Sequence, residues 1–103
     1  MDLNALKNSA KNASNLLKVM SNEWRLLILC HLANGEESVG ELEKKLSLSQ
    51  SALSQHLAVL RREKIVKSRK QAQSVTYSLA GDEAPKVMNT LHEVFCETQG
   101  DKQ

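Results

Sequence analysis

The sequence predicts a mainly α-helical fold that carries one β-hairpin, and three observations lead to this class. Apolar residues recur at the three- and four-residue steps of amphipathic helices through most of the chain. Two short β-prone segments follow one another late in the sequence. Only Trp24, Tyr77 and Phe95 are aromatic, which favours aliphatic helix packing over a β-sandwich. Because 103 residues suffice for one hydrophobic core and no second, we expect residues 1–103 to form a single domain.

The first two helices are predicted from apolar spacing and from the residues that end them. Apolar residues between Leu3 and Met20 recur at steps of three and four, which predicts an amphipathic helix. Ser21 is expected to cap a second helix that ends at Asn34-Gly35. The apolar stripe of this second helix is expected to consist of Leu26, Leu29, Cys30 and Ala33.

Two further helices are predicted, separated by a very tight turn. Ser38 and Glu41 have the spacing of a capping box, which begins a short third helix. Ser49 is expected to cap a fourth helix that runs to about Arg62. The inner stripes are Val39, Leu42 and Leu46 on the third helix, and Ala52, Leu53, His56, Leu57 and Leu60 on the fourth.

The last third of the chain predicts a hairpin and a fifth helix. The β-prone segments are 65–69 and 74–79, and the polar stretch 70–73 between them is expected to form the hairpin tip. Gly81-Asp82 begins a helix that tolerates Pro85 in its first turn. The apolar stripe of this last helix is Val87, Met88, Leu91, Val94 and Phe95. A small core does not cover the stripes of both terminal helices, so we expect a homodimer through the first and last helices.

Positive charge is concentrated in one part of the chain. The formal net charge is only +2, yet six Lys and Arg residues and a single Glu lie between Arg61 and Lys70. The segment 36–43 holds four acids and no base. A basic run of this kind is a solvated surface unless a nucleic-acid motif accompanies it.

Such a motif is present in the third and fourth predicted helices. A short helix, a tight turn and a second helix with a polar outer face form the helix-turn-helix pattern, in which the second helix enters the major groove of DNA. The basic hairpin that follows is interpreted as a wing, which predicts a winged helix-turn-helix with double-stranded DNA as its partner. The DNA-binding candidates are Ser49, Gln50, Ser51, Ser54, Gln55, His56 and Arg61 on the helix, and Lys67, Arg69, Lys70, Gln71 and Gln73 on the wing. His56 lies on the inner stripe, so a semi-buried structural histidine is the alternative to a base contact.

Features that the sequence lacks predict the compartment of the protein and the kinds of chemistry it does not perform. No apolar run reaches the roughly 18 residues of a membrane span, and no basic leader precedes an apolar stretch, so we expect a cytoplasmic protein without a membrane partner. Cytosolic thiols are kept reduced, so any bridge between Cys30 and Cys96 is expected to be conditional. The chain has no Cys-x-x-Cys motif and no glycine-framed nucleophile, so we expect no enzyme. A pure protein-interaction module is the other alternative, against which the polar face of the fourth helix argues.

Four segments together resemble the ArsR/SmtB family of winged-helix repressors, and the match spans nearly the whole chain. They are Ser21–Leu29, Val39–Leu42, Leu48–Arg61 and Val75–Leu79. The resemblance implies a homodimer built from the first and last helices, recognition helices in successive major grooves of a near-palindromic operator, and release of DNA when an inducer binds. Lys64 departs from the family pattern, because glycine often makes the turn at this position.

The metal sites of this family are not reproduced in the chain. Many members carry a Cys-x-Cys pair on the third helix, where this sequence has Glu43 and Lys45. Others use Asp and His at the start of the last helix and His and Glu near its end, but here Asp82 is followed two residues later by Ala84. His92 and Glu93 alone do not make a zinc site, which needs three or four ligands. We therefore expect no metal and no cofactor.

The two cysteines resemble those of the thiol-responsive branch of the family. In that branch, cysteines from the second and last helices form a disulfide or polysulfide bridge on exposure to oxidants or reactive sulfur, and repression is lost. The resemblance thus implies redox sensing by Cys30 and Cys96. From the residues alone, Cys30 is instead a small buried apolar side chain on its stripe. A repressor of the same family that responds to a metal or another small molecule through an unrecognised site remains the alternative function.

Overall fold

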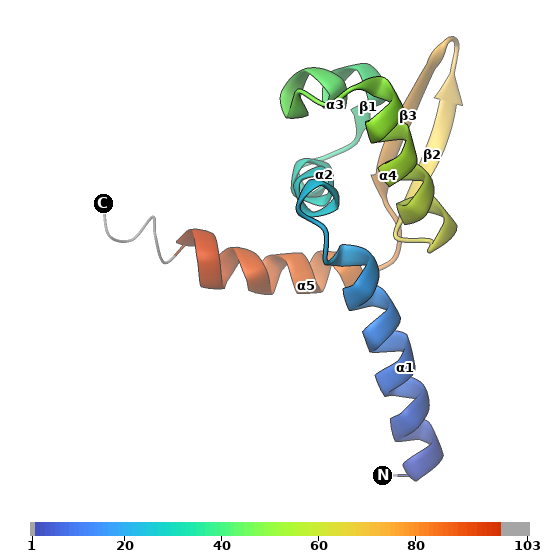
Figure 1. Cartoon of the computed structure of the whole chain (residues 1–103), viewed down its shortest axis with the longest axis vertical. Helices are drawn as coiled ribbons and strands as arrows, with labels where there is room; N and C mark the ends of the chain where they lie inside the picture. The colour runs from blue at the N-terminus through green and yellow to red at the C-terminus, as the bar shows by residue number, and fades with distance from the viewer. Residues whose placement is uncertain (1, 98–103) are drawn as a thin grey trace.

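The computed structural model describes residues 2–97, and this part of the chain is mainly helical with one antiparallel sheet, as predicted (Figure 1). The elements in chain order are α1 (Leu3–Met20), α2 (Glu23–Ala33), β1 (Glu37–Ser38), α3 (Val39–Leu46), α4 (Gln50–Arg62), β2 (Val66–Gln71), β3 (Ser74–Leu79), α5 (Glu83–His92) and the π-helical turn η1 (Glu93–Glu97). None of the helices in the described residues is long and apolar enough to cross a membrane.

The start of α2 differs from the prediction by one residue. The cap is Asn22, whose side-chain oxygen accepts a hydrogen bond from the backbone N–H of Arg25 at 3.0 Å. Ser21 belongs instead to the end of α1, where its hydroxyl donates to the carbonyl oxygen of Lys18 at 3.0 Å. Serine and asparagine are both favoured at the start of a helix. Because Ser21 ends α1, Asn22 is the residue that caps α2.

The predicted caps of α3 and α4 are confirmed. The Ser38 hydroxyl accepts from the backbone N–H of Glu41, and the Glu41 carboxylate accepts from the backbone N–H of Ser38, which completes the capping box. These hydrogen bonds hold the pKa of Glu41 below its usual value. Ser49 caps α4 by accepting from the backbone N–H of Ala52 at 3.1 Å. Between the two helices Ser47 adopts a left-handed conformation, with φ 54°, which makes the turn tight.

The sheet has three strands in the order β1-β3-β2, so it contains one strand more than the predicted hairpin. β1 is only two residues long, and it pairs Glu37 with Tyr77 and Ser38 with Thr76 along the free edge of β3. The hairpin turn is also shorter than predicted, because Gln71 and Ser74 are already paired. Ala72 makes this turn with φ 56°.

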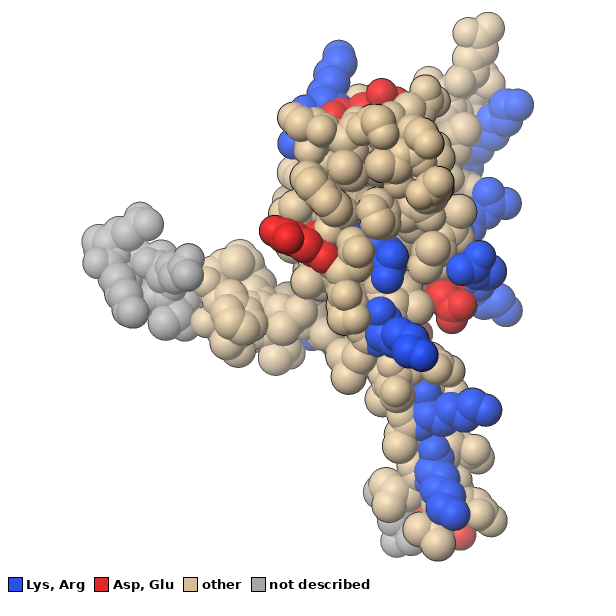
Figure 2. Space-filling view, viewed as in Figure 1, with Lys and Arg blue, Asp and Glu red and all other residues tan. Residues whose placement is uncertain are grey.

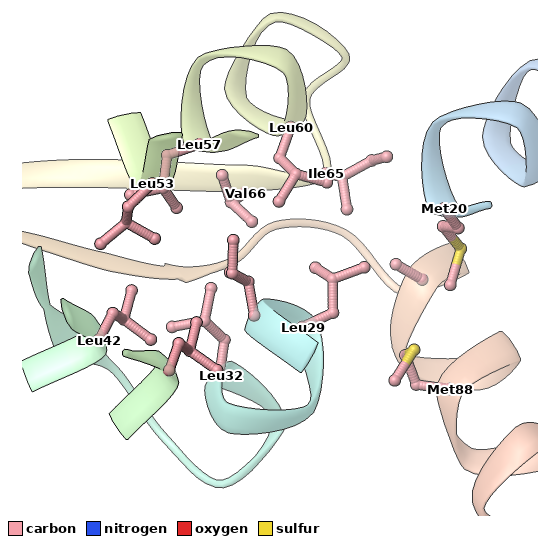
Figure 3. Close-up of a cluster of buried hydrophobic side chains, with 13 residues drawn as sticks. Met20, Leu29, Leu32, Leu42, Leu53, Leu57, Leu60, Ile65, Val66 and Met88 are labelled. Carbon is pink, nitrogen blue, oxygen red and sulfur yellow. The ribbon is translucent and has the colours of Figure 1, made fainter. Parts of the chain in front are cut away.

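The hydrophobic core lies between α2 and α3 on one side and α4 with the start of β2 on the other (Figure 3). Its largest fully buried side chains are Ile28, Leu29, Leu42, Leu53, Leu57 and Leu60. Met20 at the end of α1 and Met88 on α5 extend this core toward the terminal helices, as Figure 3 shows. The two methionines thus join the terminal helices to the central body.

α2 is the central helix, because it packs against α1, α3, α4, α5 and β3. Its buried residues are Ile28, Leu29 and Leu32, so the predicted inner stripe is wrong in part. Cys30 and Ala33, assigned to that stripe, are exposed. α2 is apolar around most of its circumference, so its spacing did not determine which side faces the core.

The terminal helices project from the body as two arms (Figure 1). The radius of gyration is 15.3 Å, whereas a compact domain of this length has about 13 Å. The arms also carry most of the large apolar side chains that remain exposed, namely Leu3, Leu6 and Leu17 on α1 and Val94 and Phe95 in η1. The described protomer therefore leaves an apolar surface uncovered on both arms.

Candidate nucleic-acid interface and cysteine pair

The first turns of α4 present a polar surface to solvent. Gln50, Ser51, Ser54 and Gln55 are exposed, while Leu53 and Leu57 on the opposite side of the helix are buried. The Ser49 cap fixes the start of the helix, and core packing fixes its rotation about its axis. Amide and hydroxyl groups held in this way can hydrogen-bond to base edges and phosphates.

His56 lies on the side of α4 that faces α2 and is half-buried. Burial lowers the pKa of His56, and the positive charge of Arg25 lowers it further. The imidazole is therefore neutral at neutral pH, so it adds no positive charge to the polar surface of α4. Its position agrees with the semi-buried structural histidine that the sequence allowed.

The basic residues form a band that borders the polar surface of α4. Figure 2 shows Lys and Arg side chains gathered along the edge of the molecule formed by α4 and β2, and again along α1. The predicted residues of this band, Arg61, Lys67, Arg69, Lys70, Gln71 and Gln73, are all exposed. Recognition helix and wing thus form one polar surface that is basic along one border, a distribution typical of proteins that bind the phosphate backbone.

Two acids of the segment 36–43 form ion pairs that the sequence did not indicate, and one of these pairs involves the wing. Arg69 donates from its guanidinium to the carboxylate of Glu36 at 3.0 Å, and to the side-chain oxygen of Gln71 at 3.3 Å. Lys45 on α3 donates to Glu37, whose other carboxylate oxygen is buried without a hydrogen bond. The only signal in the sequence was the run of acids itself, because the pairing depends on β1 lying beside β3.

The two predicted sensing cysteines lie on α2 and in η1. Both Cys30 and Cys96 are exposed as whole residues. Burial of the Cys30 thiol nevertheless raises its pKa, and the charge of Cys96 raises it further. α2 packs against α5, and α5 continues directly into η1, so the two cysteines lie on connected elements.

The turn that carries Cys96 is π-helical rather than α-helical, which the sequence did not predict. A π-turn has a wider hydrogen-bonding pattern and shifts the side chains that follow it around the axis. Val94 and Phe95, predicted for the apolar stripe of the last helix, are 54% and 62% exposed. Among the described residues, no group of three or more His, Cys, Asp and Glu side chains is arranged to hold a metal ion.

Together, the capped helix-turn-helix, its exposed polar second helix and the basic hairpin define a class of protein. Chains built in this way are winged helix-turn-helix transcription regulators that bind DNA. A model of the bacterial regulatory proteins of the arsR family matches residues 22–68. The chain belongs to the arsR family of winged-helix regulators.

Relatives with known names and structures agree with this assignment. The transcriptional activator HlyU of Vibrio cholerae is 56% identical over 91 residues, which cover 88% of this chain and 83% of that protein. The biofilm growth-associated repressor of Agrobacterium fabrum is 44% identical over 94 residues, covering 91% and 80%. A solved structure described as reduced HlyU from Vibrio cholerae superposes with a TM-score of 0.87 at 50% identity, covering 91% of this chain and 99% of that one. The repressor BigR from Xylella fastidiosa gives 0.85 at 38% identity, covering 93% and 98%.

Proposed function

We propose that this chain is a homodimeric repressor that binds a near-palindromic operator and releases it when Cys30 and Cys96 become bridged. Two features of the fold support the proposal, and they are the exposed polar face of α4 and the placement of the two cysteines. The capped α4 with its outward polar face supplies a DNA-reading surface. The two cysteines, 66 residues apart in sequence, lie on α2 and in η1, and α2 packs against α5, which continues into η1.

The residues of α4 and the wing have different roles in this proposal. Gln50, Ser51, Ser54 and Gln55 contact base edges or nearby phosphates from within the major groove, with Ser49 at the start of the helix. Arg61 and the wing residues Lys67, Arg69 and Lys70 contact the phosphate backbone, with Gln71 and Gln73 beside them. Backbone contacts set affinity and register, whereas contacts from α4 distinguish sequences.

Dimerisation through α1 and α5 accounts for the projecting arms. Exposed leucines on α1 and the exposed Val94 and Phe95 of η1 form apolar surfaces that a second copy of the chain covers. The symmetric dimer presents two α4 helices to two half-sites. Half-sites one helical turn apart, roughly 34 Å, make binding sensitive to the relative pose of the protomers.

The proposed sensing reaction is a two-electron oxidation of the thiol pair by a disulfide or polysulfide, written RS–SR. The Cys96 thiolate attacks one sulfur, so that a new S–S bond forms, the S–S bond of the reagent breaks and RS⁻ leaves. The Cys30 thiol then loses its proton to water, and its thiolate attacks Sγ of Cys96 and displaces the second RS⁻. Two protein thiols become one disulfide, and RS–SR becomes two thiols. With peroxide, Cys96 first forms a sulfenic acid, from which Cys30 displaces water.

Cys96 is placed first in this sequence because of the environment of Cys30. Burial raises the pKa of Cys30, which lowers its thiolate fraction at neutral pH and makes it the slower nucleophile. The second step is intramolecular, which offsets the lower thiolate fraction of Cys30. A bridge tethers η1, next to the dimer interface, to α2, the central helix of the DNA-binding body. Even a small change in the relative orientation of the two protomers then moves their α4 helices out of line with the two half-sites.

The relatives support different parts of the proposal. The names of two relatives describe one as an activator and another as a repressor, and repression is adopted here because direct operator binding suffices for it. A solved relative described as reduced HlyU has its redox state stated in its name, which supports a thiol-based signal for the group. We include no metal and no catalytic activity in the proposal.

The test combines mass spectrometry with DNA affinity on the same samples. The dimer is reduced, or treated with peroxide or polysulfide, and operator affinity is measured by fluorescence anisotropy. We expect a Cys30–Cys96 disulfide or sulfur-bridged species to appear as affinity falls. Cys30→Ser and Cys96→Ser variants serve as matched controls and keep their affinity under both treatments. Loss of affinity in both variants, or free thiols in released wild-type protein, refutes the dithiol signal and favours a metal or another small molecule as inducer.

A further inference from the structure

The ion pair between Arg69 and Glu36 occupies a wing arginine in the DNA-free protein. Nη2 of Arg69 lies 3.0 Å from Oε1 of Glu36, and the two side chains are 57% and 50% exposed. The same nitrogen lies 3.3 Å from the side-chain oxygen of Gln71. Nη2 of Arg69 therefore donates to two neighbouring side chains, while the arginine side chain stays accessible to solvent.

The register of the sheet explains how the two residues meet. Arg69 is paired with Thr76, and Thr76 is paired with Ser38 on β1, so these three residues form one row across the sheet. Side chains alternate between the two faces of a strand, so Glu36, two residues before Ser38, belongs to the same face as that row. Arg69 thus reaches across β3 to Glu36 on the outer face of the sheet.

This ion pair is not needed to hold the wing in place. Backbone pairing already joins β2 to β3 and β3 to β1, and exposed ion pairs contribute little to stability. Glu37 shows the contrast, because it is 8% exposed on the opposite face, where it pairs with Lys45 of α3. The Glu36 carboxylate instead holds one of the cations that the DNA backbone attracts.

We propose that Glu36 is a positioning residue that holds Arg69 away from DNA, and that a backbone phosphate replaces its carboxylate when DNA binds. The inference rests on the proposed function, in which the wing contacts the phosphate backbone. Every duplex offers the same phosphates, so Glu36 lowers the affinity for operator and for unrelated DNA alike. It thereby increases the fraction of the regulator that is free of unrelated DNA.

The test is a double-mutant cycle on the full chain with Glu36→Gln, Arg69→Gln and the double variant. The probe is a random-sequence duplex of about 30 base pairs, and anisotropy gives the affinity over a series of salt concentrations. We expect Glu36→Gln to tighten binding about two- to fivefold, the range that an exposed ion pair allows. We expect it to have no effect in the Arg69→Gln background. Arg69→Gln weakens binding and reduces the salt slope by about one.

Two controls separate this effect from a general change of charge or of fold. Glu63→Gln removes an exposed acid inside the basic run of the sequence, and its effect is expected to be the same with and without Arg69. Thermal unfolding of Glu36→Gln is expected to match that of the wild type. If Glu36→Gln has equal effects in both backgrounds, or weakens binding, the inference is overturned. If Arg69→Gln changes neither affinity nor salt slope, the wing does not contact DNA, and the proposed role of the wing fails with it.

Discussion

The carboxylate of Glu37 on β1 is buried against α3 and forms an ion pair with Lys45 of that helix. The contact joins the first helix of the helix-turn-helix to the edge of the sheet that carries the wing. Among the described residues Lys45 is the cation that pairs with this acid, and the other carboxylate oxygen of Glu37 is buried without a hydrogen bond. The pair thus connects α3, which precedes α4, to the short strand β1 that pairs with β3, and its acidic member is only 8% exposed.

Lys45→Ala is expected to lower the free energy of unfolding by about 1–3 kcal/mol, because it leaves a buried carboxylate without a partner. Urea denaturation measures the change. Lys44→Ala, on the same helix and also exposed, is the matched control and is expected to change stability by less than about 0.5 kcal/mol. Equal effects of the two substitutions would show that the Glu37 pair contributes nothing specific.

Ser49→Ala is expected to cost about 1 kcal/mol of stability and to weaken DNA binding, because it removes the cap that begins α4. Ser49→Asp separates the two effects. Aspartate restores the cap and the stability, but its negative charge lies where a phosphate approaches, so DNA affinity stays low. Denaturation and anisotropy on the three proteins decide the point, and an aspartate variant with full affinity would place the phosphate elsewhere.

Lys64→Gly is expected to stabilise the protein by about 1 kcal/mol relative to Lys64→Ala. Lys64 has φ 63° at the turn between α4 and β2, a conformation that glycine adopts without strain. Both substitutions remove the same charge, so the difference between them isolates the backbone. Thermal unfolding compares the two, and an alanine variant as stable as the glycine variant would mean that the left-handed turn carries no strain.

The pH dependence of stability is expected to report on His56. Burial and Arg25 lower the pKa of His56 in the folded state, so below pH of about 6.5 the unfolded chain binds more protons than the folded one. Stability is therefore lost as the pH falls from about 6.5 through the lowered folded value. Denaturation at a series of pH values is expected to show a smaller loss in His56→Gln than in the wild type. Parallel profiles would contradict this account.

Phe95→Ala is expected to weaken the proposed homodimer about thirtyfold, which corresponds to about 2 kcal/mol for a large anchor at an interface. Sedimentation equilibrium measures the dissociation constant. Lys86→Ala, an exposed residue on α5, is the control and is expected to leave it nearly unchanged. A Phe95→Ala variant that dimerises as tightly as the wild type would remove η1 from the interface.

The fold and the exposed polar side of α4 were largely predictable because local signals agreed there. The starts of α3 and α4 show this agreement. In both cases a capping residue stands directly before an apolar stripe of helical period. The caps form the predicted hydrogen bonds, through Ser38 and Glu41 in α3 and through Ser49 in α4. The polar side of α4 follows directly from its buried side, since the helical period fixes both.

The remaining features depend on tertiary contacts that leave no periodic signal. Two residues of β1 are too few to show alternation, and they are strand only because β3 offers them a free edge. On α2, Ile28 is buried and Cys30 is exposed, although both belong to a nearly continuous apolar run. The turn η1 is π-helical, although no residue in its sequence marks the change from α-helical geometry.

The strand order β1-β3-β2 leaves β2 as an outer strand of the sheet in the described residues. An outer strand offers unpaired backbone groups to any other extended chain, and natural proteins block such pairing with charged side chains. β2 carries Lys67, Arg69 and Lys70. The charges assigned here to DNA binding thus also protect the wing from aggregation, so neutralising all three to abolish binding would at the same time expose the molecule to self-association through its sheet.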